Sequence, residues 1–237
     1  MNDVTRERPA TTASLMAAIV AVEGSARHAH VRYLLGPQPS RRDLADAVHA
    51  LCLIYGTRPG TVDLAVAQHI QPAADTWLAA VAAGFTGERA ALVRLTALAG
   101  PLPSTPGQAA FEAALAGVNR ALAMLAGSGR VGCATGAAAA LVGDWQVMRA
   151  VMIATAVDCG VALPDSVLPP VAVTAAAITM LGKDAAAERA MAFGARQLLA
   201  QHQGLWTLMQ ARAAARDRLY PHRYDRSQPM PASAPML

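Results

Sequence analysis

Alanine fills roughly a quarter of the chain, whereas only 4% of its residues are aromatic. Alanine has the highest intrinsic helix propensity, and glycine and proline are the residues that most often end a helix. The segments between glycines and prolines are long, alanine-rich and poor in β-branched residues. No segment alternates apolar and polar residues as a half-buried strand would. The sequence therefore predicts an all-α fold, a compact array of eight to ten helices with no β-sheet.

Glycine and proline divide the chain into the segments that we expect to be helical. These segments are 12–35 with a kink at Gly24, 40–55, 61–70, 72–83 ending at Gly84 and Gly87, 88–99, 108–126, 133–141 and 144–159 (or one helix bent at Gly143), 169–181 and 184–220. Ser40 with Asp43 resembles a capping box, and Asp184 is expected to cap the last helix. Gly132 and Gly136 would let two helix backbones approach closely.

We expect one helical domain over residues 11–220, between disordered ends at 1–10 and 221–237. Both ends are polar or rich in proline and serine, a composition that does not support a packed core. Residues 100–107 (GPLPSTPG) are the strongest loop in the chain and a candidate hinge.

Three features favour a soluble, cytoplasmic protein with no membrane partner. The mean hydropathy is +0.30, but the most apolar stretches are shorter than the ~20 residues of a spanning helix. These stretches are 131–143, 150–157 and 167–182. Asp3 and Glu7 interrupt the basic start that an export signal needs. Three widely spaced cysteines (Cys52, Cys133 and Cys159) indicate buried thiols rather than a disulfide framework.

The charge pattern gives no sign of a nucleic-acid partner. The net charge is +4, and the arginines that gather between residues 212 and 226 are diluted by Asp217 and Asp225. A nucleic-acid surface needs a denser basic stripe with aromatic stacking partners. No nucleotide fingerprint, phosphate loop, nucleophile elbow or zinc-ligand quartet is present either.

Histidine and aspartate gather in the first three expected helices. Asp46 and His49 are three residues apart and project from nearly the same helix face. With His30 and His69 they would supply imidazole and carboxylate ligands for a divalent metal such as Fe or Zn. The alternative is an ordinary pair, with Asp46 exposed to solvent and His49 beside the apolar stripe of its own helix, and we favour that alternative.

Several patches of the chain resemble a known family. They are Arg42 to Cys52, Gly56-x-x-Pro59-Gly60, Ser104 to Ala109, and Ala140-Leu141-Val142-x-Asp144-Trp145. Over residues 28–160 the chain is similar to an uncharacterised family of all-helical alphaproteobacterial proteins. The resemblance implies a bacterial cytosolic helical domain and carries over neither an activity nor a catalytic residue.

Two classes of function fit the sequence. The first, which we favour, is a non-catalytic helical module without a cofactor that binds a small apolar ligand or a partner helix, or forms a homo-oligomer. The abundance of small apolar residues and the lack of a catalytic set support it. The second is a metal-dependent enzyme with a site among the first three helices. The metal content of the purified protein discriminates between the two.

Overall fold

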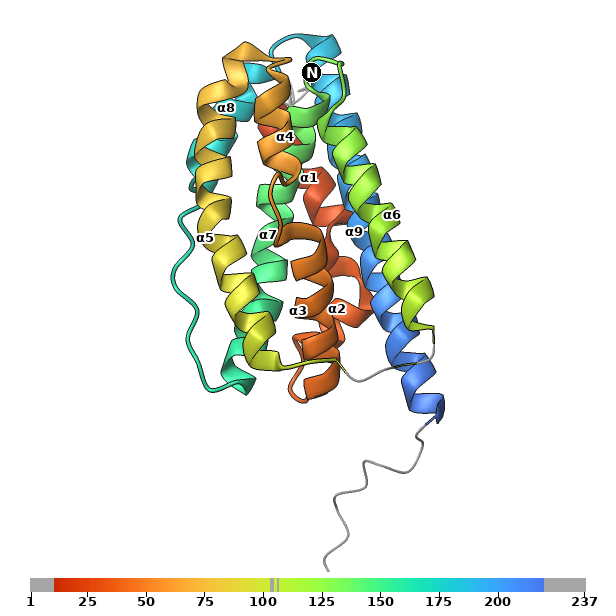
Figure 1. The fold of residues 1–237 in the computed structure, drawn as a ribbon. Coiled ribbons are helices and arrows are strands. Elements are labelled where there is room, and N and C mark those ends of the chain that lie inside the picture. The colour runs from red at the N-terminus through yellow and green to blue at the C-terminus, as the bar shows by residue number, and fades with distance from the viewer. Residues whose placement is uncertain (1–10, 103–104, 106, 220–237) are drawn as a thin grey trace, which may run out of the picture.

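The described residues form an elongated bundle of nine α-helices with no strand (Figure 1). The computed structural model describes residues 11–102, 105 and 107–219. The predicted all-α fold is confirmed over these residues. The predicted disordered ends, 1–10 and 221–237, lie outside them.

Most helices begin and end close to glycine or proline residues, as the sequence predicts. The helices are α1 Thr12–Glu23, α2 Ala29–Leu34, α3 Arg41–Tyr55, α4 Thr61–Gln68, α5 Asp75–Ala99, α6 Gln108–Ala126, α7 Cys133–Asp158, α8 Val171–Leu181 and α9 Ala185–Leu219. Short 3-10 turns lie at Ser25–Arg27 and Pro72–Ala74. The single helix predicted over 12–35 with a kink at Gly24 is instead two helices, since α1 ends before Gly24 and the chain turns before α2 begins.

The predicted breaks at Gly84 and Gly87 are wrong, because α5 runs through both residues without interruption. Of the two arrangements expected around Gly143, the structure has the single helix, α7. Gly84 instead allows a close approach: a Cβ there would lie 2.9 Å from the Cα of Leu168. Glycine in a helix costs about 1 kcal/mol relative to alanine, and close packing offsets that cost here.

One of the two predicted helix caps is present. The Oδ2 of Asp184 accepts hydrogen bonds from the backbone N–H groups of Ala186 (3.1 Å) and Ala187 (3.0 Å). The capping box predicted at Ser40 is wrong, since the Ser40 side chain makes no capping bond. Its partner, Asp43, is turned toward Tyr33 and Arg216 instead.

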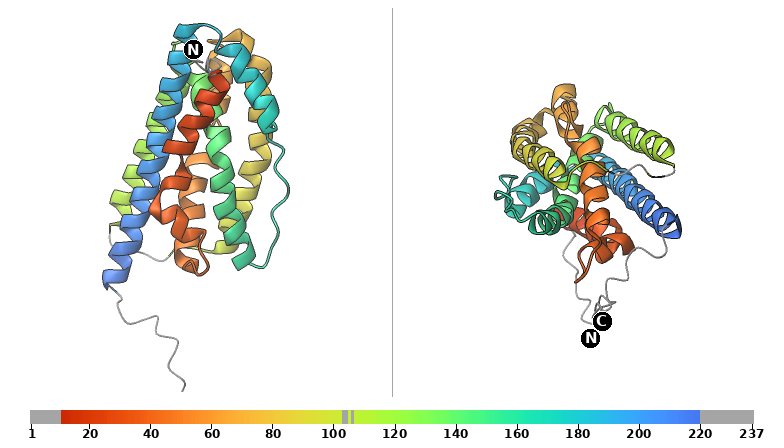
Figure 2. Two further views of the ribbon diagram at one scale, coloured as in Figure 1. Left: turned by 180° about the vertical axis from the view of Figure 1, so that it is seen from behind. Right: turned by 60° about the horizontal axis from the view of Figure 1, so that its bottom comes forward.

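The core is built around α7 and α9, which pack against each other along most of their length (Figure 2). Trp145 of α7 and Trp206 of α9 are completely buried there. The predicted close approach of two helices at Gly136 is confirmed, since a Cβ at Gly136 would lie 2.1 Å from the carbonyl oxygen of Met191. The same is true from the α9 side, where a Cβ at Gly194 would lie 2.0 Å from the carbonyl oxygen of Cys133.

Two described helices, α6 and α7, are long and apolar enough to span a membrane by length and composition alone. The apolar stretches of the sequence were expected to be too short, but two of them join in the 26-residue helix α7. In α7, 67% of the apolar window is buried inside the bundle, and a core helix of a soluble protein passes the same test. In α6, 28% is buried. These helices are weak support for a membrane role, and the cytoplasmic location stays a prediction.

Candidate functional site

The centre of the bundle contains a buried polar network that joins four separate segments. Asp144 lies on α7, His202 on α9 and Tyr55 at the end of α3, and Ser25 opens the turn after α1. All four side chains are buried, and Trp206 of α9 lies beside them. Because buried polar groups must be hydrogen-bonded to avoid a large desolvation cost, each contact in this network matters.

Asp144 is the acceptor on which the network converges. Its Oδ1 accepts from the backbone N–H of Ser25 at 2.7 Å, and its Oδ2 accepts from the Ser25 hydroxyl and from Nδ1 of His202, the latter at 2.6 Å. Nε2 of His202 lies 2.5 Å from the Tyr55 hydroxyl. The indole N–H of Trp206 donates to the Ser25 oxygen at 2.7 Å. Five groups from distant parts of the chain are thus satisfied together.

The pKa values of the two acids of this network, Asp144 and Tyr55, are shifted in opposite directions. Burial alone would raise the pKa of Asp144, but hydrogen bonds from His202 and Ser25 outweigh it and hold that pKa below its usual value. Burial, assisted by the charge of Asp144, raises the pKa of the Tyr55 phenol well above its usual value. Asp144 is therefore the ionised acceptor and Tyr55 the protonated donor at neutral pH.

The residue types of this network are those of a hydrolase triad, but their connections are different. A serine nucleophile needs a histidine base within hydrogen-bond reach, whereas the Ser25 hydroxyl donates to Asp144. The second nitrogen of His202 is engaged by Tyr55. Since none of these side chains reaches solvent, we assign the network a role in holding the turn after α1 against α7 and α9.

A second buried polar cluster joins α3 to the end of α9. Asp46 is 4% exposed, which contradicts the expectation that it faces solvent. Its Oδ1 accepts from Nε of Arg212 at 3.0 Å, and its Oδ2 accepts from Arg216, which also pairs with Asp43. Arg212 further donates to Gln108 at 2.7 Å. Both oxygens of Asp46 are thus engaged by guanidinium groups.

Two of the other predicted metal ligands, His49 and His69, have partners away from Asp46. His49 bonds through Nε2 to the carbonyl oxygen of Gly100 at 2.8 Å, and His69 lies at the end of α4 with Nδ1 2.6 Å from Asp75. His30 is buried near Asp43 and Asp46, and the desolvation lowers its pKa. Over the described residues, no three His, Cys, Asp or Glu side chains form a group that could hold a metal ion.

An apolar cavity of about 340 Å³ lies between α1, α7 and α8. Its walls include Met16 and Val20 of α1, Val142 of α7 and Ile178 of α8, together with several alanines. The cavity lies on the face seen in the left view of Figure 2, where α1, α7 and α8 are neighbours. Cavities of this size and composition are typical of small-molecule sites.

Two polar side chains and no charged one line this cavity. They are Gln146 of α7 and Thr174 of α8. The hydroxyl of Thr174 accepts a long hydrogen bond of 3.5 Å from the indole N–H of Trp77. The chemistry of the walls therefore suits an uncharged molecule that is mostly apolar and carries at most one or two polar groups.

The chain belongs to a family of unknown function (DUF6975), whose sequence profile matches residues 20–217. This match confirms the predicted membership of an uncharacterised family and extends it on both sides of residues 28–160. The alphaproteobacterial origin stays a prediction. No curated protein and no solved structure matches the chain. The family assignment carries no activity, ligand or site residue with it.

Proposed function

We propose that this protein binds a small, uncharged, largely apolar molecule in the cavity between α1, α7 and α8. The observation that carries the proposal is the composition of the cavity wall, in which 12 of the 14 lining residues are apolar or glycine and two, Gln146 and Thr174, are polar but uncharged. Apolar surface drives entry of such a ligand, at about 25 cal/mol per Å² removed from water. The two polar groups would fix its orientation.

The packing of α8 supports a ligand that enters and leaves. Of its 11 residues, Ile178 and Leu181 are buried, whereas Val171 is 78% exposed. A helix with few buried contacts opens at a lower free energy than the core helices do. The cavity is open to solvent beside α8, where Val171 and Gln146 are exposed, and movement of α8 would widen it while leaving the α7–α9 core intact.

We expect an uncharged fluorophore, N-phenyl-1-naphthylamine, to bind in the cavity of the parent protein. It should bind more weakly to a variant in which a larger side chain fills the cavity. Ala175→Leu introduces a larger side chain on the wall of the cavity. We expect it to weaken binding at least about tenfold, since overpacking at a filled site costs about 1–3 kcal/mol. Fluorescence titration measures the effect.

The matched control is Ala176→Leu, one residue along α8. Ala176 is exposed and does not line the cavity, so this variant should bind the fluorophore like the parent protein. Equal binding by the two variants would place the fluorophore elsewhere and overturn the proposal. Thermal melts of both variants separate loss of the cavity from loss of the fold.

The exposed surface of α8 also favours a second form of binding, either self-association or contact with a helix of a partner protein. Its outer face exposes Val173 and Met180, and no charged residue lies within the helix. Apolar patches of this kind often mark protein interfaces. If light scattering shows a dimer, and dilution to the monomer abolishes fluorophore binding, the small-ligand proposal is wrong and the cavity belongs to an interface.

Metal-dependent catalysis at His30, Asp46, His49 and His69 is the alternative that the sequence raised. Asp46 is bound by two arginines through both of its oxygens, so its use as a metal ligand would require breaking buried ion pairs with Arg212 or Arg216. We therefore expect untagged protein, grown with Fe, Zn and Mn supplied, to carry far less than one metal ion per chain in elemental analysis. A ratio near one that falls on His49→Ala substitution would favour the enzyme.

A further inference from the structure

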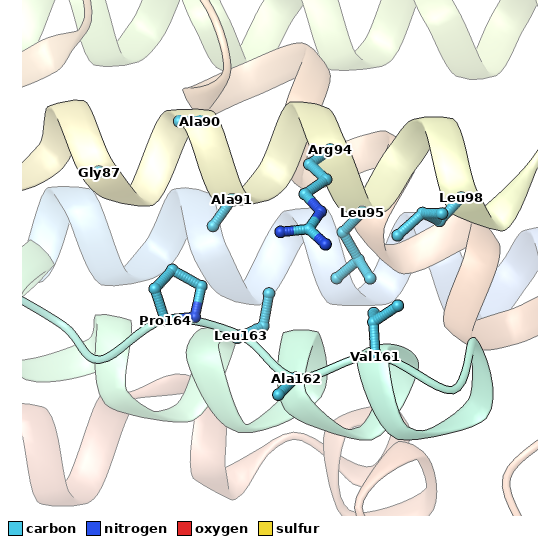
Figure 3. Close-up of a pocket in the computed structure, with 10 residues that line it drawn as sticks. All are labelled: Gly87, Ala90, Ala91, Arg94, Leu95, Leu98, Val161, Ala162, Leu163 and Pro164. Atoms are coloured by element: carbon cyan, nitrogen blue, oxygen red, sulfur yellow. The ribbon is translucent and has the colours of Figure 1, made fainter.

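A groove lies between α5 and the connector that follows α7, away from the α1/α7/α8 cavity (Figure 3). One wall is α5, with Leu95 and Leu98, and the other is the extended segment 161–164, with Val161 and Leu163. The groove has a volume of about 240 Å³ and is lined by ten residues, nine of which are apolar or glycine. Leu98 remains 46% exposed in it.

Buried polar contacts hold the connector in place and so keep the groove open. Arg149 of α7 pairs with Glu88 of α5 at 2.7 Å and donates its other Nη to the carbonyl oxygen of Pro164. The Ser166 hydroxyl donates to Glu88 at 2.6 Å. Both Arg149 and Glu88 are buried, which makes this anchor costly to break. The groove is therefore a built feature rather than a gap beside a loose loop.

Arg94 is the one charged residue that lines the groove. Figure 3 shows its side chain extending from α5 toward the 161–164 segment, with the guanidinium between Leu95 and Leu163. Arg89, on the same helix, and Arg149 each pair with a carboxylate. Over the described residues, no carboxylate lies within ion-pair distance of Arg94. Arg94 is exposed, so within the described residues this apolar groove carries a positive charge that is accessible to a ligand and has no paired carboxylate.

We propose that this groove binds a small amphiphile with a carboxylate head group. The guanidinium of Arg94 would receive the carboxylate, because its N–H groups match the two oxygens in a bidentate pair. The apolar chain would lie between Leu95, Leu98 and Leu163. The single arginine matches a single negative charge. This site is separate from the α1/α7/α8 cavity, which has no charged wall residue, and the two proposals stand independently.

The test compares decanoate with 1-decanol, which has the same chain length and no charge, by isothermal titration calorimetry below the micelle concentration of decanoate. All titrations use the Ala175→Leu variant, because its filled α1/α7/α8 cavity does not take up the uncharged alcohol. We expect decanoate to bind up to about fivefold more tightly, because a partly exposed ion pair contributes up to about 1 kcal/mol. Arg94→Gln should remove this preference, and Arg94→Lys should restore part of it. The preference should also shrink as salt is added.

Arg120→Gln is the matched control, because Arg120 is exposed on α6 and lines neither cavity. It should keep the full preference for decanoate. Because the other cavity is filled in all these measurements, failure of one proposal is distinguishable from failure of the other. Equal binding of decanoate and decanol, or unchanged decanoate binding by Arg94→Gln, would overturn the carboxylate site.

Discussion

Asp144→Ala is expected to lower the free energy of unfolding by about 4 kcal/mol. The substitution leaves three buried donors without their acceptor: the backbone N–H of Ser25, its hydroxyl, and Nδ1 of His202. Each buried group without a partner costs about 1–3 kcal/mol, and rotation of the Ser25 hydroxyl recovers part of the sum. Urea denaturation followed by circular dichroism measures the loss.

Asp158→Ala is the matched control on the same helix. Asp158 pairs with Arg41 at 2.8 Å, but the Arg41 side chain is 76% exposed. An exposed pair of this kind contributes about 0–1 kcal/mol, so the control should remain close to the parent protein. If the two alanine variants were equally stable, the buried network would have no structural role.

The same carboxylate sets a direction for the pH dependence of stability. Because the pKa of Asp144 is lower in the folded protein than in the unfolded chain, the unfolded chain binds more protons in acid. The stabilisation is complete above the unfolded carboxyl pKa of about 4, and it is lost as the pH falls through the folded value. The Asp144→Asn variant should therefore lose less stability than the parent protein between pH 5 and pH 3, since an amide does not titrate.

The helices could be predicted well from the sequence because the start, the end and the stability of a helix depend mostly on residues close together in the chain. Alanine runs and the aspartate cap at residue 184 act within a few residues, and the structure places them as expected. The errors arose where tertiary packing decided the outcome. Gly84 lies inside α5 rather than at its end, and the close approach of Leu168 of the connector explains why a glycine is needed there.

The candidate sites depended on pairings that no spacing in the sequence reveals. Asp144 and His202 are 58 residues apart, and Asp46 and Arg216 are 170 apart. His202 did carry one usable signal, since it shares a helix face with Leu198, Leu205, Trp206 and Met209, which are all buried. A histidine on such a face needs a buried partner, but periodicity does not name that partner.

Gly136→Ala is expected to destabilise the protein by at least about 3 kcal/mol. A methyl group at this position would lie 2.1 Å from the carbonyl oxygen of Met191 and 2.4 Å from its Cα. Backbone atoms of a packed helix cannot move aside as a flexible side chain can, so α7 and α9 would have to separate. Overpacking of this kind costs about 1–3 kcal/mol and sometimes more. The midpoint of thermal or urea unfolding measures the loss.

Gly204→Ala is the matched control, and its expected effect has the opposite sign. Gly204 lies on α9, as Met191 does, but a Cβ there would meet nothing within 4 Å. Alanine is favoured over glycine in an open helix position by about 1 kcal/mol, so this variant should be slightly more stable than the parent protein. If both variants were more stable than the parent protein, helix propensity would dominate over packing. Opposite signs would show that backbone contact between α7 and α9 requires glycine at position 136.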